Sequence, residues 1–368
     1  MKSLSLTLCL TALLALTTAA AVTPAGRAAD APHAIVVGPG QSIQRAIDRA
    51  RPGDTIAVSA GVYRENLLIT KDHLTLRGAG AGPAGTVLEP PATPRKTKCN
   101  EFGEVTGICV LGKLDNGLGK PVTGTRVRGL LVRGFSRFGI QLANAADTTV
   151  SKSDLSYNGR YGVIALFVSH VRLVDNLVHE NGQGGLYIGD SRNARAVVTG
   201  NRSYGNGVHR GQGGMGMYFK NAPNGLVRDN QVEGNCVGIL IVGFSKPRMT
   251  GWTVRDNVVR HNTSACRPSD EGGPPLSGFG IALLGTERFL VEHNRVSGNH
   301  PTEKTPLAGG IIVAATPVKG GPAANHNLIR NNRVRGNGPA DIVLDGRGRG
   351  NRLLDNACTT SIPKGFCR

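Results

Sequence analysis

Residues 173–182 read LVDNLVHENG, and closely related phrases follow five more times toward the C-terminus. They are VVTGNRSYGNG at 197–207, LVRDNQVEGN at 226–235, TVRDNVVRHN at 253–262, LVEHNRVSGN at 290–299 and LIRNNRVRGN at 328–337. Each phrase predicts a short strand, an asparagine, a shorter strand and a second asparagine. Self-similarity of this kind is typical of a solenoid, in which every coil buries its apolar face against the next.

The asparagines keep a fixed place in every repeat. The first stands at Asn176, Asn201, Asn230, Asn257, Asn294, Asn332 and Asn356, and the second follows at Asn181, Asn206, Asn235, Asn262, Asn299 and Asn337. Asparagine tolerates the left-handed backbone of a tight corner, and its amide can bond to the same amide one rung away. We therefore expect the asparagines themselves to form the corners of the coil.

A third strand completes each repeat, because glycine and a hydrophobic run follow the second asparagine, as in GLYI from Gly185 and GILI from Gly238. Three strands per 22 to 38 residues predict an all-β right-handed parallel β-helix. A sandwich or a propeller does not fit this period. The inward column is apolar, with Leu173, Val198, Val227, Val254, Val291, Ile329 and Leu353 before the first asparagine and Val178, Val232, Val259, Val296 and Val334 after it.

The chain begins with a lysine, an apolar stretch at 4–22 and small residues at Ala28 and Ala29, a pattern typical of a secretory signal peptide. We expect a signal peptide at 1–29 and one β-helix domain at 30–368, with a disulfide-containing loop insertion at 90–125 and a C-terminal cap at 356–368. No other segment has the roughly 20 apolar residues that span a bilayer. The predicted location is extracellular.

Six cysteines remain after the expected cleavage, and an exported protein can keep them paired. Cys236 and Cys266 follow second-position asparagines of neighbouring coils, which stack at roughly 4.8 Å, so we pair them with each other. Sequence proximity pairs Cys99 with Cys109 and Cys358 with Cys367. No CxxC or His/Cys spacing indicates zinc, and we assign no metal site. Calcium and any other cofactor stay open.

Basic residues exceed acidic ones by 43 to 25, which gives a formal charge of +18. Such a charge suits an acidic polymer or an anionic cell surface, and it is also a common means of staying soluble. No nucleic-acid motif appears, and aromatic residues are only 4% of the chain, so we do not expect nucleic acid as a partner. We expect a monomer.

The mature N-terminus reads SIQRAIDRARPGDTIAVSAGVYRENLLITKDHLTLRGAG at 42–80, where Ile43, Ala46, Ile47 and Ala50 predict an amphipathic helical turn over the end of the solenoid. This opening, followed by asparagine-cornered rungs, resembles the pectin-lyase-like superfamily, and more closely its generic β-helix-repeat proteins, including the NosD-like group. The resemblance covers about residues 35 to 360. It implies the fold, whereas superfamily members include lyases, hydrolases, esterases, epimerases and proteins without a known reaction. The chain carries neither the YG-x-DPHE run of alginate epimerases nor the aspartate cluster of calcium-dependent pectate lyases.

Insertions mark the working face of a solenoid, and here they flank the glycine-led strand, at 207–214, 263–279 and 300–309 before it and at 243–251 and 314–327 after it. In the superfamily the equivalent strand and loops form the polysaccharide groove. The outward residue of each strand should form the floor, at Gln141, Ile164, Tyr187, Tyr218, Leu240, Ala282 and Ile312. Tyr187 and Tyr218 would then be neighbours and offer a platform for a sugar ring.

Near this platform the chain offers candidates for catalysis and for substrate binding. A uronate lyase or epimerase needs a cation for the carboxylate, a base and an acid, and we assign these roles among His209, Arg210, Tyr218 and Lys220. We assign substrate binding to Tyr187, Asp190, Arg192 and Asn221. A glycosidase needs two facing carboxylates; Asp190 has no evident partner, and Asp270 and Glu271 lie in a long loop.

Two alternatives stay open. The mostly apolar floor and the paired tyrosines are equally expected of plain packing, which would make the protein a non-catalytic binding or structural β-helix. Arginines beside the asparagine corners form either a solvated face balanced by Asp229 and Asp256 or a track for a polyanion; they are Arg202, Arg228, Arg255, Arg260, Arg295, Arg330, Arg333 and Arg335. The function that the sequence favours is binding or modification of an acidic polysaccharide, with lyase or epimerase chemistry ahead of hydrolysis.

Overall fold

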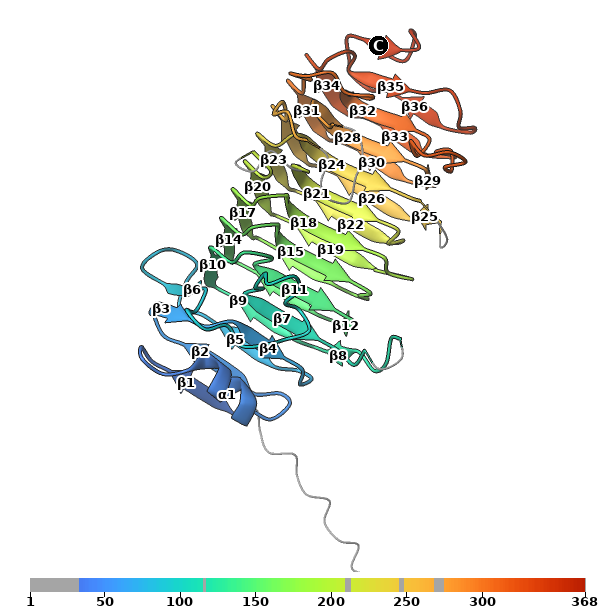
Figure 1. The fold of residues 1–368 in the computed structure, drawn as a ribbon. Coiled ribbons are helices and arrows are strands. Elements are labelled where there is room, and N and C mark those ends of the chain that lie inside the picture. Colours follow the sequence, from blue (N-terminus) through green and yellow to red (C-terminus); the bar gives the residue numbers. More distant parts are fainter. Residues whose placement is uncertain (1–32, 115–116, 209–212, 245–247, 268–274, 368) are drawn as a thin grey trace, which may run out of the picture. The chain divides into compact units, whose positions relative to one another are not determined.

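Three parallel sheets form the faces of the coil in the computed structural model, which describes residues 33–114, 117–208, 213–244, 248–267 and 275–367. Within each coil the chain passes through sheet A, then sheet B, then sheet C. Coils follow one another in chain order along every sheet, as the colours of Figure 1 show. This is the predicted right-handed parallel β-helix.

Sheet A contains the strands that precede the first asparagine. In spatial order they are β1 (Ala34–Val37), β2 (Thr55–Val58), β5 (Thr75–Arg77), β9 (Arg126–Arg128), β13 (Thr149–Ser151), β16 (Arg172–Val174), β19 (Ala196–Thr199), β22 (Gly225–Arg228), β26 (Trp252–Arg255), β30 (Leu290–Glu292), β33 (Leu328–Arg330) and β36 (Arg352–Leu354).

Sheet B contains the short strands between the two asparagines. They are β3 (Gly61–Arg64), β6 (Thr86–Glu89), β10 (Leu130–Arg133), β14 (Asp154–Ser156), β17 (Leu177–His179), β20 (Arg202–Tyr204), β23 (Gln231–Glu233), β27 (Val258–Arg260), β31 (Arg295–Ser297) and β34 (Arg333–Arg335).

Sheet C contains the glycine-led strands, among which are the longest strands described in the chain. The strands of sheet C are β4 (Leu67–Ile69), β7 (Ile108–Leu111), β11 (Ile140–Ala143), β15 (Tyr161–Leu166), β18 (Gly184–Gly189), β21 (Met215–Lys220), β24 (Val237–Val242), β28 (Phe279–Leu284), β32 (Gly309–Ala314), β35 (Ile342–Leu344) and β37 (Ser361–Ile362). Two small pairs extend the turns after sheet C, namely β8 (Val122–Thr123) with β12 (Ala145–Ala146) and β25 (Met249–Thr250) with β29 (Thr286–Glu287).

Both asparagine columns form buried hydrogen-bonded ladders. The side-chain oxygen of Asn257 accepts from the backbone N–H of Asn230 at 3.0 Å and from its side-chain amide at 2.9 Å. The Asn257 amide in turn donates to Asn294 at 2.9 Å and to the carbonyl of Val227 at 3.0 Å. Each asparagine therefore satisfies backbone groups that the chain leaves unpaired where it turns from one sheet to the next.

The prediction that asparagine supplies the left-handed corner was wrong by one residue. The left-handed backbone belongs to the preceding residue, as in Asp175 before Asn176, with φ 53°, and Glu180 before Asn181, with φ 54°. The asparagine itself turns its amide into the ladder, where it is buried. Many side chains occupy the left-handed position, including Asp, His, Glu, Tyr and Gly, which is why the corner is less regular in sequence than the ladder.

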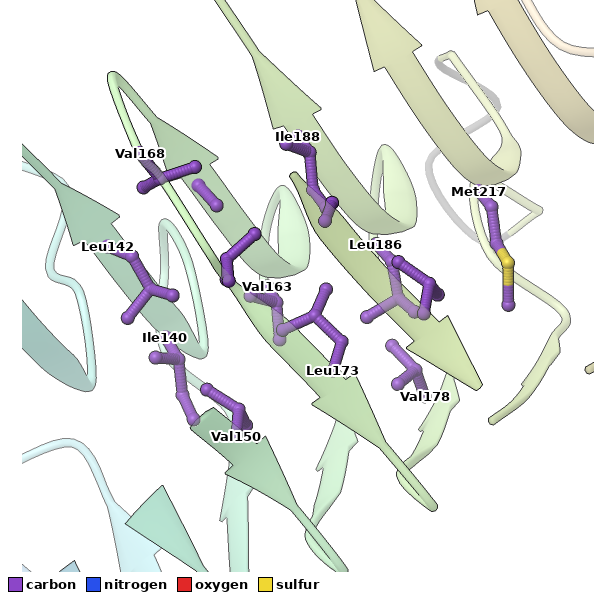
Figure 2. Close-up of a cluster of buried hydrophobic side chains, with 14 of the residues drawn as sticks. Ile140, Leu142, Val150, Val163, Val168, Leu173, Val178, Leu186, Ile188 and Met217 are labelled. Carbon is purple, nitrogen blue, oxygen red and sulfur yellow. The ribbon is translucent and has the colours of Figure 1, made fainter. Parts of the chain in front are cut away.

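The inward residues of the three sheets form one continuous apolar core. Leu173 of sheet A, Val178 of sheet B and Leu186 of sheet C are all fully buried and meet inside one coil, together with Ile188 (Figure 2). The predicted inward column is confirmed over its whole length, with only Leu353 in the last coil partly buried. Each such side chain contributes about 1.5–3 kcal/mol relative to an exposed one.

Helix α1 (Ile43–Arg49) covers the first coil, as the amphipathic pattern predicts, and buries Ile43, Ala46 and Ile47. Seven residues are too few for a helix that is stable on its own. Side chains from other segments bind both ends of α1. The carboxylate of Glu65 accepts from the N–H of Ile43 at 2.8 Å. The ammonium of Lys71 donates to the carbonyl of Asp48 at 2.6 Å.

Gln44 of helix α1 closes the free edge of sheet C. Its side-chain oxygen accepts from the backbone N–H of Leu68 on β4 at 2.7 Å, and its amide donates to the carbonyl of Leu68 at 3.1 Å. One side chain thus makes the pair of bonds that a neighbouring strand would make.

The six described cysteines pair as the sequence predicts, in three disulfides, Cys99–Cys109, Cys236–Cys266 and Cys358–Cys367. The Cα atoms of Cys236 and Cys266 lie 5.8 Å apart, which agrees with one rung of stacking. The reasoning from the shared corner is therefore confirmed.

Candidate functional site

The outward face of sheet C presents the predicted floor. In-register pairing places Gln141, Ile164, Tyr187, Tyr218, Leu240, Ala282 and Ile312 one above the next. Ile164, Leu240, Ala282 and Ile312 are buried. Ile164 packs with Phe138, Tyr161 and Tyr187, whereas the other three pack with loop residues such as Leu276, Leu307 and Ala308. The floor is therefore apolar on both sides of the two tyrosines.

Four aromatic rings from consecutive rungs stack along the N-terminal part of this face. Tyr187 and Tyr218 are stacked with their centroids 4.8 Å apart and their planes at 14°. Tyr161 lies 5.3 Å from Tyr187, and Phe138 lies 6.3 Å from Tyr161. Tyr161 and Tyr187 are 8% exposed, whereas Tyr218 is only half-buried. Tyr218 therefore offers the accessible ring of the stack.

A groove of about 950 Å³ opens beside Tyr218. Its apolar lining comes from strand ends and from the inserted loops, and includes Met215, Leu240, Val242, Phe244, Leu276, Phe279, Leu284, Leu307 and Val318. This volume lies within the range of small-molecule sites. The loops at 263–279, 300–309 and 314–327, which the insertion pattern selected, supply much of its wall.

Four cationic side chains line the same groove, Lys220 at the end of β21 and Arg267, Lys319 and Arg347 on loops. Among the described lining residues the one carboxylate is that of Asp345, which accepts from the backbone N–H of Ala315 at 2.7 Å and of Arg347 at 3.0 Å. Asp345 thus holds two loops together. The excess of positive charge makes the groove attractive to anions.

Tyr218 and Lys220 reach this groove from one strand. They stand two residues apart, so both side chains leave the same face of β21. The Lys220 ammonium lies 5.8 Å from the centroid of the Phe244 ring, a cation–π contact that holds it over the groove. The structure therefore brings two of the predicted catalytic residues into one cavity.

Three of the predicted substrate-binding residues lie elsewhere. Asp190, Arg192 and Asn221 line a second hollow of about 560 Å³ at the turn after sheet C. Asp190 and Asn221 both have left-handed backbones, with φ 46° and 47°. The Asn221 amide donates to the Asp190 carboxylate at 3.1 Å, and its oxygen accepts from the N–H of Phe244 at 2.8 Å. These contacts give both residues a role in shaping the turn.

The remaining predicted catalytic residues, His209 and Arg210, lie outside the described residues, as do Asp270 and Glu271. No group of three or more His, Cys, Asp or Glu side chains that could hold a metal occurs in the described part of the chain. None of the described helices has the length and apolar character needed to cross a membrane.

The Cys236–Cys266 disulfide fixes one wall of the groove. Cys266 forms an antiparallel bridge with Leu276, and both Leu276 and Arg267 line the cavity. Gly214 packs directly against the two sulfurs, where a Cβ atom would overlap both of them, and has φ +68°. Glycine is therefore required here for two independent reasons.

The arginines beside sheet A belong to a balanced surface. Arg228 pairs with Asp229 at 2.9 Å, Arg255 with Asp256 at 3.3 Å and Arg330 with Glu292 at 2.8 Å. Of the two alternatives that the sequence left open, the structure supports the balanced face for these three.

Sequence reasoning missed Arg267, Lys319 and Arg347. The first two lie in loops that the insertion pattern had selected, so the segment was signalled but the side chain was not. Arg347 follows β35 in a short connection without any periodic signal. Loop side chains reach the groove by irregular paths that no repeat encodes.

A family model described as right handed beta helix region matches residues 138–319. Among solved structures, the A-module of mannuronan C-5 epimerase AlgE6 from Azotobacter vinelandii aligns with a TM-score of 0.58 at 18% identity, over 85% of this chain and 88% of that one. The A-module of AlgE4 from the same organism aligns with a TM-score of 0.54 at 20% identity, over 85% and 89%. A DFA-IIIase from Arthrobacter chlorophenolicus, without its lid, aligns with a TM-score of 0.55 at 15% identity, over 83% and 84%.

The curated protein sequences contain no match to the chain. At these identities the structural similarity establishes the fold alone. The chain is therefore a right-handed parallel β-helix, similar in fold to these epimerase modules and to this DFA-IIIase.

Proposed function

We propose that this chain is exported and acts on an acidic, uronate-containing polysaccharide in the groove over sheet C, by β-elimination or C-5 epimerisation. The observation that carries the proposal is the meeting of Tyr218 and Lys220 in one cationic groove, next to the stacked Tyr187 ring. The apolar N-terminal segment and the three disulfides support export.

Charge favours an anionic polymer as the substrate. Lys220, Arg267, Lys319 and Arg347 face a groove whose single described carboxylate already accepts two backbone hydrogen bonds. A uronate chain supplies carboxylates for these cations, and the accessible face of Tyr218 supplies a surface for a sugar ring. The similar epimerase modules act on mannuronan, as their name states.

Chemistry favours elimination or epimerisation over hydrolysis. Both reactions begin with removal of the proton beside a carboxylate, and a cation that neutralises this carboxylate makes the proton more acidic. In this proposal Lys220 neutralises the carboxylate and the Tyr218 phenol transfers the proton. The position of both side chains on one face of β21, lining the same groove, supports these roles. A glycosidase would need two facing carboxylates, and the described lining contains one, that of Asp345.

The test is incubation of the purified protein with pectate, alginate and glycosaminoglycans. Unsaturated uronate absorbance reports elimination, and proton NMR of the recovered polymer reports epimerisation. Activity on one of these polymers that falls in both Lys220→Gln and Tyr218→Phe supports the proposal. Lys152→Gln, at the corner between sheets A and B, is the matched control for lost charge.

Non-catalytic binding is the second candidate, and the apolar lining of Leu240, Leu276 and Leu284 favours it. It predicts retention of a polyuronate that weakens in Lys220→Gln, without change in polymer length or stereochemistry. If Lys220→Gln and Tyr218→Phe both keep wild-type binding and activity, the groove is neither the catalytic site nor the binding site.

A further inference from the structure

Two clusters on the outward face of sheet B follow one plan, in which a single glutamate bridges two arginines. Glu89 on β6 pairs with Arg64 on β3 at 3.3 Å and with Arg133 on β10 at 2.8 Å. Glu233 on β23 pairs with Arg202 on β20 at 2.8 Å and with Arg260 on β27 at 2.7 Å. In each cluster the carboxylate lies between the rungs that carry its arginines.

The arrangement of one glutamate between two arginines is not repeated toward the C-terminal end of sheet B. The column that holds Glu233 continues through Arg260, Ser297 and Arg335. Ser297 thus lies between two arginines, as Glu89 and Glu233 do, but it brings a hydroxyl instead of a carboxylate. In the adjacent column Arg295 pairs directly with Arg333.

Three of these arginines have no acidic partner among the residues that the structure describes. Arg295, Arg333 and Arg335 are exposed, and no described carboxylate lies within ion-pair distance of them. Glu233, two rungs before Ser297 in the same column, already binds Arg202 and Arg260. Rungs repeat at about 4.8 Å, so like charges stand one rung apart and repel one another.

We propose that Ser297, with Arg295, Arg333 and Arg335 around it, forms an anion-binding seat for a carboxylate or sulfate group of an acidic polysaccharide. The ligand group takes the place that Glu89 and Glu233 fill in the two complete clusters. Guanidinium groups bind such planar or tetrahedral oxyanions through paired hydrogen bonds. The seat lies on sheet B and is separate from the groove over sheet C.

A polysaccharide fits this seat better than a nucleic acid. None of the four seat residues is aromatic, so the seat has no platform on which bases can stack. The arginines occupy two neighbouring rungs and therefore offer contacts to one or two anionic groups of a chain lying across them. Further groups of a long polymer would extend past the seat and add avidity.

The decisive variant is Ser297→Glu, because it places a carboxylate where the structure lacks one. We expect it to raise the melting temperature at low salt, as an added bridging glutamate should, and to weaken binding of a heparin oligosaccharide and an oligoalginate by about tenfold or more. Titration calorimetry at low and high salt measures both oligosaccharides. Two other strands of sheet B, β6 and β23, already carry glutamate at this position, so the variant is expected to fold.

Arg333→Gln with Arg335→Gln should weaken binding to a similar extent without raising the melting temperature. Arg64→Gln removes an exposed arginine that is already paired, and it is the matched control for net charge. All measurements use the Lys220→Gln background, so that failure of the seat and failure of the groove are told apart. Inorganic sulfate serves as the minimal probe, and it should raise the melting temperature less in Ser297→Glu than in its parent.

Unchanged affinity for both oligosaccharides in Ser297→Glu and in the double variant would overturn the proposal. An equal loss in Arg64→Gln would also overturn it, since the effect would then reflect net charge alone. Single-stranded DNA of matched charge is the last probe. Tighter binding of DNA than of either oligosaccharide, lost in the same variants, would replace the proposed ligand class with nucleic acid.

Discussion

The ring of Tyr218 lies on the ring of Tyr187, 4.8 Å between centroids and 14° from parallel. One rung of the β-helix separates them, so the spacing of the stack is set by the backbone of sheet C. Tyr187 is buried in this arrangement and fixes the plane of Tyr218, whose other face borders the groove. A rigid ring costs less ordering entropy on binding than a mobile one.

Two substitutions of Tyr218 separate its role as a stacking surface for a sugar ring from its role in proton transfer. Tyr218→Ala should weaken polyuronate binding roughly twofold to tenfold, since an aromatic contact contributes about 0.5–1.5 kcal/mol. Tyr218→Phe should keep that binding and lose turnover, because it removes only the phenol. Equilibrium binding and product formation are measured on the same preparations. Normal turnover in Tyr218→Phe would exclude the phenol as the proton donor or acceptor.

The asparagine ladder should be costly to interrupt. Asn257→Ala leaves the backbone N–H of Asn230 and the carbonyl of Val227 without the partners they have now. Each unpaired buried group costs about 1–3 kcal/mol, so the midpoint of urea unfolding should fall markedly. Gln231→Ala is the control. It removes an exposed side chain of β23, directly after Asn230, and should leave the midpoint of urea unfolding nearly unchanged.

Gly214 should be intolerant of any side chain. Gly214→Ala brings a Cβ atom onto both sulfurs of the Cys236–Cys266 disulfide and strains a backbone at φ +68°. Gly336→Ala carries a similar backbone strain at φ +63° but meets no atom within 4 Å. The difference in unfolding free energy between the two variants therefore isolates the overlap, and we expect about 1–3 kcal/mol. Equal losses would show that the loop moves away without cost.

Glu233 should make stability depend on pH in the acid range. Burial raises the pKa of this carboxyl, but the hydrogen bonds and charges of Arg202 and Arg260 outweigh burial, so its pKa lies below the ordinary glutamate value of 4.5. A lowered folded-state pKa gives stability that is present above the unfolded-state pKa and disappears as pH falls through the folded-state value. Melting temperatures of wild type and Glu233→Gln should therefore differ near neutral pH and converge in acid. A difference that persists at the lowest pH would mean that charge is not its cause.

The sequence predicted the scaffold well because the scaffold is periodic. The ladder positions, the inward column from Leu173 to Ile329 and the Cys236–Cys266 pair all follow from counting residues within a repeat. The corner itself was misplaced by one residue, since the left-handed position accepts residues as different as Asp175 and Tyr157. A position that accepts many residue types shows no clear pattern in the sequence.

The candidate site was predicted only where it lies on the periodic part. Tyr187 and Tyr218 were predicted correctly as rung neighbours on the outward face of sheet C, because alternation along a strand is regular. Lys220 was expected just after the strand, and it is the last residue of β21. Asp190 and Asn221 were selected for their polarity, whereas their place directly after a strand marks them as turn residues. Arg267 and Arg347 reach the groove from irregular loops, so only the folded chain reveals them.

The bonds between Gln44 and Leu68 have a consequence for self-association. A parallel sheet that ends in an unpaired strand is a template for another copy of the same chain, and copies that add end to end build fibres. Gln44 satisfies the backbone N–H and carbonyl of Leu68 with a side chain, which a second molecule cannot extend. A chain shortened to begin at residue 51 should therefore polymerise, with light scattering that grows with concentration, while the intact protein stays clear.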